Sequence, residues 1–205
     1  MIDVLRLLLG RREYRKVKIS KNRRIFDYID DMQPFVRNGE WDSLEESYRA
    51  VCEKLAGTVQ AKKVEALDFP SYENKLRSAL SHAAQRLVRT GTKALYFEYD
   101  MDNAWRSGFF LCHTYNPQEV GNDEWACEYA DDFEGPDFEA AGDVYLEDDG
   151  TFDETKKAMG TTLYLIARTV AAFGRCVESM EFEATAVCLA FHDQDPVVRI
   201  FEASN

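Results

Sequence analysis

The spacing of hydrophobic positions along the chain changes near residue 93. Before this point, apolar residues recur every three or four positions, which is typical of amphipathic helices. The first such run covers 25–32 and stops before Pro34, because proline lacks the backbone N–H that a helix interior needs. We therefore expect residues 1–93 to be mainly helical.

Two longer helices are predicted within this half. Ser43 and Glu46 have the spacing of a capping box, in which two side chains bind free backbone N–H groups at a helix start. A later helix is predicted to begin at Pro70 and to end at Gly91, since glycine suits the left-handed conformation that follows a helix. The apolar stripe behind the capping box comprises Leu44, Tyr48, Val51, Leu55 and Val59.

After residue 93 the apolar positions alternate, as they do in strands. The first alternating run is 95–99 and the second is 109–115. The Asp-Met-Asp-Asn sequence at 100–103 suits a turn, because Asp and Asn side chains bind nearby backbone groups. The two runs predict a hairpin, and we expect a third strand over 125–130.

The remaining chain predicts a loop, a helix and a final hairpin. Residues 131–150 show neither period, and loops of this length are usually functional or mobile. The clearest helix pattern covers 154–177, and strand patterns follow at 185–191 and 197–202. We therefore predict a single α+β domain over 1–205. It has N-terminal helices, a largely antiparallel sheet of about five strands, and one long helix before the last hairpin.

Charge is distributed unevenly along the chain. The net charge of −12 divides into +6 over 1–93 and −18 over 94–205. Binding of nucleic-acid phosphates needs Lys and Arg, so the acidic half argues against DNA or RNA as the ligand. Nine Lys and Arg residues lie within 1–24. We interpret them as a basic face that packs near the acidic half, the alternative being a nucleic-acid-binding arm.

The cysteines and apolar runs indicate a reduced, cytoplasmic protein. Five cysteines occur at long spacings without a C-x-x-C pair, which argues against a disulfide framework and a zinc site. Cys112 and Cys188 lie in apolar runs, where a thiol behaves as a small hydrophobic group. No stretch has the roughly 20 apolar residues of a membrane span. The apolar run at 4–9 is shorter than a signal-peptide core.

The most unusual stretch of the chain is 107–155. It contains fifteen carboxylates and neither Lys nor Arg, yet its aromatic residues supply the apolar surface needed to fold. Crowded carboxylates repel one another, and a basic partner relieves that repulsion while aromatic side chains anchor the interface. The simpler alternative is a solvated surface with a few core aromatics. The predicted partner-binding residues are Asp131, Asp132, Phe133, Glu134, Asp137, Phe138, Glu139, Asp143, Glu147, Asp148 and Asp149.

Two groups of acids are candidates for cation binding. Asp100 and Asp102 have the spacing of a divalent-metal pair, but no nearby basic residue could receive a phosphate, and we favour a hairpin turn. Glu147, Asp148 and Asp149 offer clustered oxygens to calcium, although they lack the alternating spacing of an EF-hand loop. The sequence therefore predicts no resident metal.

No motif in the chain identifies an enzyme. There is no G-x-S-x-G, no glycine-rich phosphate loop and no H-E-x-x-H. His82 and His113 fall on predicted helix and strand positions. His192 precedes Asp193 and Asp195, which makes it the candidate acid–base residue, with an ordinary turn as the simpler interpretation. We therefore predict a binding protein that uses no cofactor.

Four short motifs lie in the acidic half: YFEYDMDN at 96–103, YNP at 115–117, WACEY at 125–129 and EGP at 134–136. Together they resemble bacterial immunity proteins of polymorphic-toxin and contact-dependent growth inhibition systems, over 94–146. The resemblance implies a cognate toxin domain as the partner, often a basic nuclease, neutralised by covering its active site. The basic first half departs from a uniformly acidic inhibitor. A small divalent-metal-dependent enzyme and an acidic adaptor domain are the alternatives.

Overall fold

The computed structural model describes residues 17–20, 23–147, 150–180, 182, 185–194 and 197–202. The helices are α2 (Ile25–Asp30), α3 (Gln33–Arg37), α4 (Trp41–Leu55), α5 (Thr58–Glu65), α6 (Phe69–Thr90), α7 (Glu139–Leu146) and α8 (Lys156–Glu178), with the 3₁₀ turns η1 (Gln118–Val120) and η2 (Glu124–Cys127). The strands are β1 (Ala94–Asp100), β2 (Arg106–Cys112), β3 (Tyr129–Glu134), β4 (Ala186–Phe191) and β5 (Val198–Phe201).

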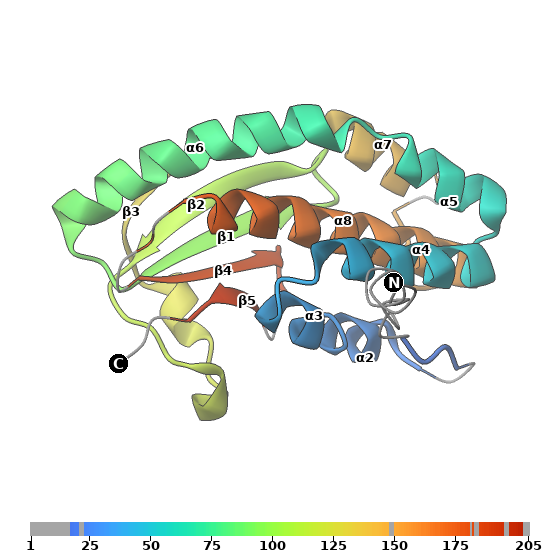
Figure 1. The fold of residues 1–205 in the computed structure, drawn as a ribbon, viewed down its shortest axis with the longest axis horizontal. Helices are drawn as coiled ribbons and strands as arrows, with labels where there is room; N and C mark the ends of the chain where they lie inside the picture. Colours follow the sequence, from blue (N-terminus) through green and yellow to red (C-terminus); the bar gives the residue numbers. More distant parts are fainter. Residues whose placement is uncertain are drawn as a thin grey trace, which may run out of the picture.

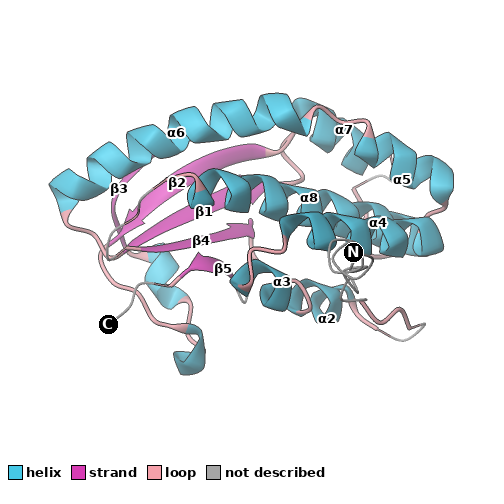
Figure 2. Ribbon diagram, in the orientation of Figure 1, coloured by secondary structure: helices cyan, strands magenta, loops and turns pink. Residues whose placement is uncertain are grey.

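The strands form one five-stranded sheet in the order β3-β2-β1-β4-β5 (Figure 2). β1 pairs in parallel with β4, whereas the other neighbouring strands are antiparallel. A parallel pair requires a crossover connection, and α8 precedes β4 along the chain. The predicted α+β class, with a largely antiparallel sheet of about five strands, is confirmed.

Helix α8 lies at the centre of the molecule. It has 23 residues and is buried on nearly all sides, and its buried polar residues include Arg168, which donates to the Val64 and Glu65 carbonyl oxygens at 2.7 and 3.0 Å. The Thr155 hydroxyl accepts a hydrogen bond from the Ala158 N–H at 3.0 Å and caps its start. Figure 1 shows α6 and α8 extending from the sheet to α4, α5 and α7 at the other end. No helix in the described part of the chain is long and apolar enough to cross a membrane.

One hydrophobic core joins the two halves of the sequence. It contains residues from α2 to α6 together with residues from the strands and α8, such as Tyr48, Phe97 and Phe173. The Phe97 and Phe173 rings are stacked, with centroids 4.8 Å apart. The sheet and the helical layer therefore share a single packed interior.

The predicted ends of the first-half helices are partly confirmed. Helix α6 includes Pro70 in its first turn and ends at Gly91, whose φ of 64° is left-handed. The capping box is wrong, because α4 begins at Trp41 and Ser43 already lies inside the helix. The apolar stripe also ends earlier than predicted. Val59 is 85% exposed, because the chain breaks after α4 and starts α5 in a new direction.

Two predictions in the acidic half are corrected. The third strand is β3, displaced from 125–130 to Tyr129–Glu134, because η2 occupies the start of the predicted range. Residues 131–150 are not a loop: they contain the end of β3 and the helix α7. The second strand ends at Cys112, so His113 is exposed rather than alternating with core residues. Most of the basic segment 1–24 lies outside the described residues.

Candidate functional site

The two faces of the sheet are covered differently. One face packs against the helices through Leu95, Phe97 and Tyr99 of β1. The opposite face, called here the open face, carries a second apolar cluster, and residues 113–128, the cover segment, pack over part of it. The cluster comprises Ala94, Tyr96, Cys112, Trp125, Ala186, Cys188, Ala190 and Val197.

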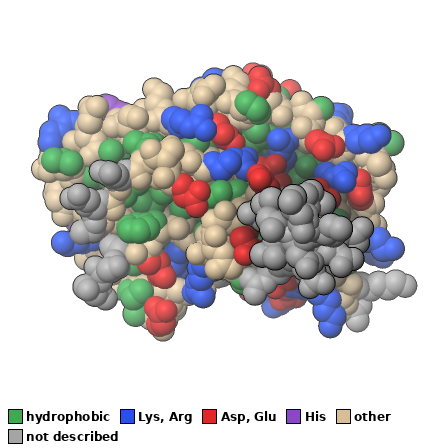
Figure 3. Space-filling view, viewed as in Figure 1, with side chains coloured by type: hydrophobic (Ala, Val, Ile, Leu, Met, Phe, Trp, Pro, Cys, Tyr) green, Lys and Arg blue, Asp and Glu red, His purple; other side chains and the backbone are tan. Residues whose placement is uncertain are grey.

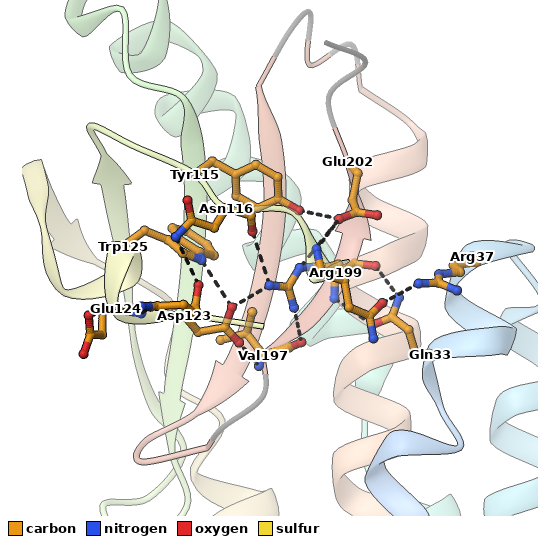
Figure 4. Close-up of polar contacts among 12 residues, drawn as sticks. Gln33, Arg37, Tyr115, Asn116, Asp123, Glu124, Trp125, Val197, Arg199 and Glu202 are labelled. Carbon is orange, nitrogen blue, oxygen red and sulfur yellow. Dashed lines mark hydrogen bonds and ion pairs between the residues drawn. The ribbon is translucent and has the colours of Figure 1, made fainter. Parts of the chain in front are cut away.

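Arg199 of β5 ties the cover segment to the sheet (Figure 4). Its side chain is 2% exposed, and its Nη2 atom lies 2.5 Å from Asp123 Oδ1. Nη1 donates to the Val197 carbonyl oxygen and Nη2 to that of Asn116, both at 3.3 Å. Asp123 also accepts from Trp125 Nε1 at 3.2 Å and from the Val197 N–H at 3.0 Å. These contacts are needed because an unpaired buried charge is costly.

Glu202 and Gln33 complete this network. Glu202 Oε1 accepts from the Tyr115 hydroxyl at 2.7 Å and from the Gln118 N–H at 3.2 Å. The Gln33 side-chain amide donates to the Arg199 carbonyl oxygen at 2.8 Å and accepts from the Arg199 N–H at 3.0 Å. Gln33 thus takes the place of another strand beside β5. The network fixes the cover segment, and Gln33 supplies hydrogen-bond partners for the Arg199 backbone groups at one edge of the sheet.

A cavity of about 610 Å³, the open-face cavity, lies between the cover segment and the turn after β4. Four carboxylates line it, and its described lining contains neither Lys nor Arg. Its size falls in the range of about 300–1,000 Å³ that is usual for ligand sites. The carboxylates are Glu98, Asp123, Glu124 and Asp193, and the other lining residues are Tyr96, Gly121, Asn122, Ala126, Cys127, His192, Gln194 and Val197.

Glu98 is held at the floor of this cavity by two neighbours. Its Oε2 atom accepts from the Tyr96 hydroxyl and its Oε1 atom pairs with His192 Nδ1, both at 3.1 Å. Burial raises the pKa of Tyr96, which keeps that hydroxyl a neutral donor. The hydrogen bond with Glu98 raises the pKa of His192. The imidazole partner is therefore Glu98; Asp193 Oδ1 is 3.8 Å from His192 Nε2, and Asp195 lies outside the described residues.

The sheet register extends this acidic surface towards β3. Glu98 is paired with Gly108, and Gly108 with Glu134, so the two carboxylates share one face at about 10 Å, two strand spacings. Asp132 is opposite Phe110, whose ring contacts Tyr96 on the same face. We call Glu98, Asp132, Glu134 and the cavity carboxylates the acidic open face. Arg106, the first residue of β2, lies opposite Asp100 on this same face and is exposed, so one cation borders the acidic open face.

The predicted partner-binding acids divide into paired and unpaired groups. Asp131 pairs with Arg86 at 2.9 Å, and Glu147 pairs with Lys63, so helix cations already neutralise these two. Asp148 and Asp149 lie outside the described residues. The remaining predicted acids are exposed and have no ion pair within the described ranges: Asp132, Glu134, Asp137, Glu139 and Asp143.

The two predicted aromatic anchors belong to the core. Phe138 is 8% exposed and is stacked on Tyr72, with centroids 4.6 Å apart. Phe133 is half-buried: its ring is stacked on Phe109 at 5.0 Å, and the Arg86 guanidinium lies 4.8 Å from its centroid. Neither ring is a free anchor for a partner. The prediction that Phe133 and Phe138 contribute to partner binding is therefore restricted to the backbone and the charged residues next to them.

The predicted metal pair is a turn, as we favoured. Asp100 Oδ1 accepts from the N–H groups of Asp102 and Asn103, at 3.0 and 3.2 Å. No group of three or more potential ligands for a metal occurs in the described part of the chain. All five cysteines are free thiols, and Cys112 and Cys188 are buried as predicted. Cys127 is exposed at the open-face cavity.

Two residues that build the site are absent from the sequence prediction. Arg199 falls within the predicted last strand, where a lone Arg among apolar strand residues signals a buried ion pair. Glu98 falls within the first predicted strand, and its contact with His192 depends on the parallel pairing of β1 with β4. Comparison of the chain with family models, curated proteins and solved structures gives no match.

Proposed function

We propose that the protein is an immunity-type inhibitor, which binds and neutralises a basic toxin domain in the bacterial cytoplasm. One observation carries the proposal: the acidic open face joins a cavity to exposed carboxylates on β3, and the described lining of that cavity holds four carboxylates and neither Lys nor Arg. The resemblance of 94–146 to immunity proteins supplies the class of partner.

The physical support is the contrast between two surfaces. Figure 3 shows one face of the molecule, on which Lys and Arg are interspersed with Asp and Glu. Such a mixture produces little long-range field. The acidic open face, by contrast, carries mainly carboxylates beside a concave, partly apolar surface, with Arg106 at its margin and Arg199 buried beneath Asp123. Fields of this kind focus at clefts and accelerate the arrival of a partner of opposite charge.

The proposal is tested by growth rescue. The tagged protein is used to capture partners from the producing bacterium, and each captured protein is expressed alone and with the inhibitor. We expect a basic protein that stops growth when alone and is tolerated with the wild type. Asp132→Lys with Glu134→Lys should lose protection, whereas Glu46→Lys with Glu65→Lys, an equal charge change on α4 and α5, should keep it. Loss of protection by both variants would contradict the proposed surface.

A second candidate function rests on His192 and Glu98. An imidazole–carboxylate pair beside a cavity can hold or transfer a proton, and Cys127 lines the same cavity. An enzyme of this kind would inactivate a toxin, or its product, catalytically. Titration of a fixed toxin amount separates the two functions: a binding inhibitor needs equimolar protein, whereas an enzyme acts at a small fraction of that and loses activity in Glu98→Gln.

A further inference from the structure

A second cavity, of about 380 Å³, lies between α3, the start of α4, the end of α8 and β5. We call it the Trp41 cavity. It is on the helical side of the β5 edge and shares no lining residue with the open-face cavity. Its lining combines apolar and polar groups and comprises Val36, Arg37, Asn38, Gly39, Trp41, Val177, Glu178, Met180, Phe182, Ile200 and Phe201.

Trp41 presents an unused hydrogen-bond donor at this cavity. The residue is 6% exposed, and its Nε1 atom has no hydrogen-bond partner among the residues that the structure describes. The six-membered ring lies against Gly174 of α8, while Nε1 lies beside Gly39 at the cavity wall, where the Glu178 carboxylate is closer still. Buried indole N–H groups normally have a partner, so an orphan donor beside a cavity points to an absent acceptor.

The polar neighbours of the cavity do not supply that acceptor. Arg37 donates to the Gln118 side-chain oxygen, and Asn38 donates to Glu40 at 3.3 Å. The Glu178 carboxylate lies over Gly39 but makes no hydrogen bond with Trp41. Glu178 is exposed, so its side chain can swing away and open the route to Nε1. Its negative charge disfavours an anionic ligand and favours a neutral one.

We propose that the Trp41 cavity binds a small molecule with an apolar body and one neutral hydrogen-bond acceptor, such as a carbonyl oxygen, which accepts from Trp41 Nε1. The apolar body packs against Val177, Met180 and Ile200. The cavity is large enough for a ligand of this kind, since small-molecule sites begin at about 300 Å³. This binding site goes beyond the proposed inhibitor function and does not depend on it.

Two probes of nearly equal shape test the proposal. Acetophenone has an apolar ring and a carbonyl oxygen, whereas ethylbenzene has the ring without an acceptor. Each is titrated into the ¹⁵N-labelled full chain, and the indole N–H signals are followed by NMR. We expect acetophenone to shift the Trp41 signal downfield in a saturable way. Ethylbenzene should bind at least about tenfold more weakly, because it leaves the donor unsatisfied.

Two variants locate the effect. Trp41→Phe removes the donor and identifies the Trp41 signal. Followed by the backbone amide signals of the cavity residues, this variant should bind both probes equally. Ile200→Phe narrows the cavity from β5 and should weaken both probes while leaving the Trp41 N–H in place. If Trp41→Phe does not fold, the test rests on the ratio of the dissociation constants of the two probes, measured in the wild type and in Ile200→Phe. No saturable shift of the Trp41 signal, or equal binding of the two probes by the wild type, overturns the proposal.

Discussion

Burial separates the five thiols into four inert ones and one accessible one. Desolvation raises the pKa of Cys52 and Cys112 to about 12 and that of Cys176 to about 11, and it also raises the pKa of Cys188. Thiolates are the reactive form, so these four should not react at neutral pH. Cys127 is exposed.

We therefore predict that one thiol per molecule reacts with Ellman's reagent in the native protein. All five should react after unfolding. Cys127→Ser should remove the native reaction, and a reducing agent should leave the melting temperature of the wild type unchanged. Rapid reaction of a second thiol, or a fall of the melting temperature with dithiothreitol, would show that the buried positions or the free thiols are misassigned.

At the same scale, the pKa of His192 depends on its contact with Glu98. The pKa of His192 is raised from its ordinary value of 6.5, chiefly by the hydrogen bond to Glu98. A raised folded-state pKa stabilises the fold below the unfolded pKa, and this contribution is lost as the pH rises through the folded pKa. This contribution to the free energy of unfolding is small, because the imidazole is largely exposed to solvent.

An NMR titration of the imidazole checks this contact. We expect a His192 pKa above 6.5 in the wild type, and a return towards that value in Glu98→Gln. The melting temperature of the wild type should exceed that of Glu98→Gln by more below the unfolded pKa than above the folded one. An unchanged His192 pKa in Glu98→Gln would mean that the two side chains do not meet in solution.

At the scale of elements, the cover segment depends on a buried ion pair. Asp123 and Arg199 are 12% and 2% exposed, and removal of one partner leaves the other charged and buried. Breaking such a pair typically costs about 3–5 kcal/mol. Asp123→Asn and Arg199→Met should each approach that cost in the free energy of unfolding.

A double-mutant cycle measures this coupling by denaturant unfolding. The double variant should cost clearly less than the sum of the single variants, because neither charge is then left alone. Hydrogen exchange of the amides in 113–128 should accelerate in the single variants. Arg49→Met is the matched control, since Arg49 forms only partly exposed pairs with Glu46 and Glu53, and should cost about 1 kcal/mol or less. Equal costs for Arg49→Met and Arg199→Met would contradict the anchoring role.

Several helices and strands are predicted correctly by the sequence. The long helix, the first hairpin and the last strands follow from periodicity, because their packing agrees with their local pattern. The sequence predicts a loop over 131–150 because neither period is evident there, whereas the structure has the short helix α7, which contains Gly142. That glycine is required by packing: a Cβ atom there would lie 2.7 Å from the Ala104 Cα atom. The buried positions Phe138, Ala141, Val144 and Tyr145 carried the helical signal that was missed.

The candidate site was less accessible from sequence than the fold. Glu98 and His192 are 94 residues apart and meet because β1 and β4 pair in parallel. Nothing in local periodicity specifies that pairing. The acidic character of the second half was readable, but charge alone did not separate Asp131, which Arg86 neutralises, from the exposed Asp132. Side-chain partners depend on tertiary packing, which the local pattern of a single sequence does not specify.

At the scale of the whole molecule, internal ion pairs redistribute the charge. Arg175 of α8 pairs with Glu45 and Glu73, at 2.5 and 2.9 Å, so part of the acid in the helical layer is neutralised there. Arg86 and Lys63 neutralise Asp131 and Glu147 at the boundary of the acidic segment. Within the acidic open face, Arg199 pairs with Asp123 and His192 with Glu98, so the unpaired excess there lies mainly on Asp132 and Glu134 of β3, and it continues on α7. We infer that this excess steers a basic partner to the open face.

The association rate with the captured partner, measured at about 50 and 300 mM salt, tests this claim most directly. Steering predicts fast association by the wild type at low salt and a steep fall at high salt. Asp132→Lys with Glu134→Lys should slow association about tenfold at low salt and flatten its salt dependence, with a smaller effect on dissociation. Glu46→Lys with Glu65→Lys should stay within about twofold of the wild type. Association that is unaffected by the first pair, or slowed equally by both pairs, would contradict the account.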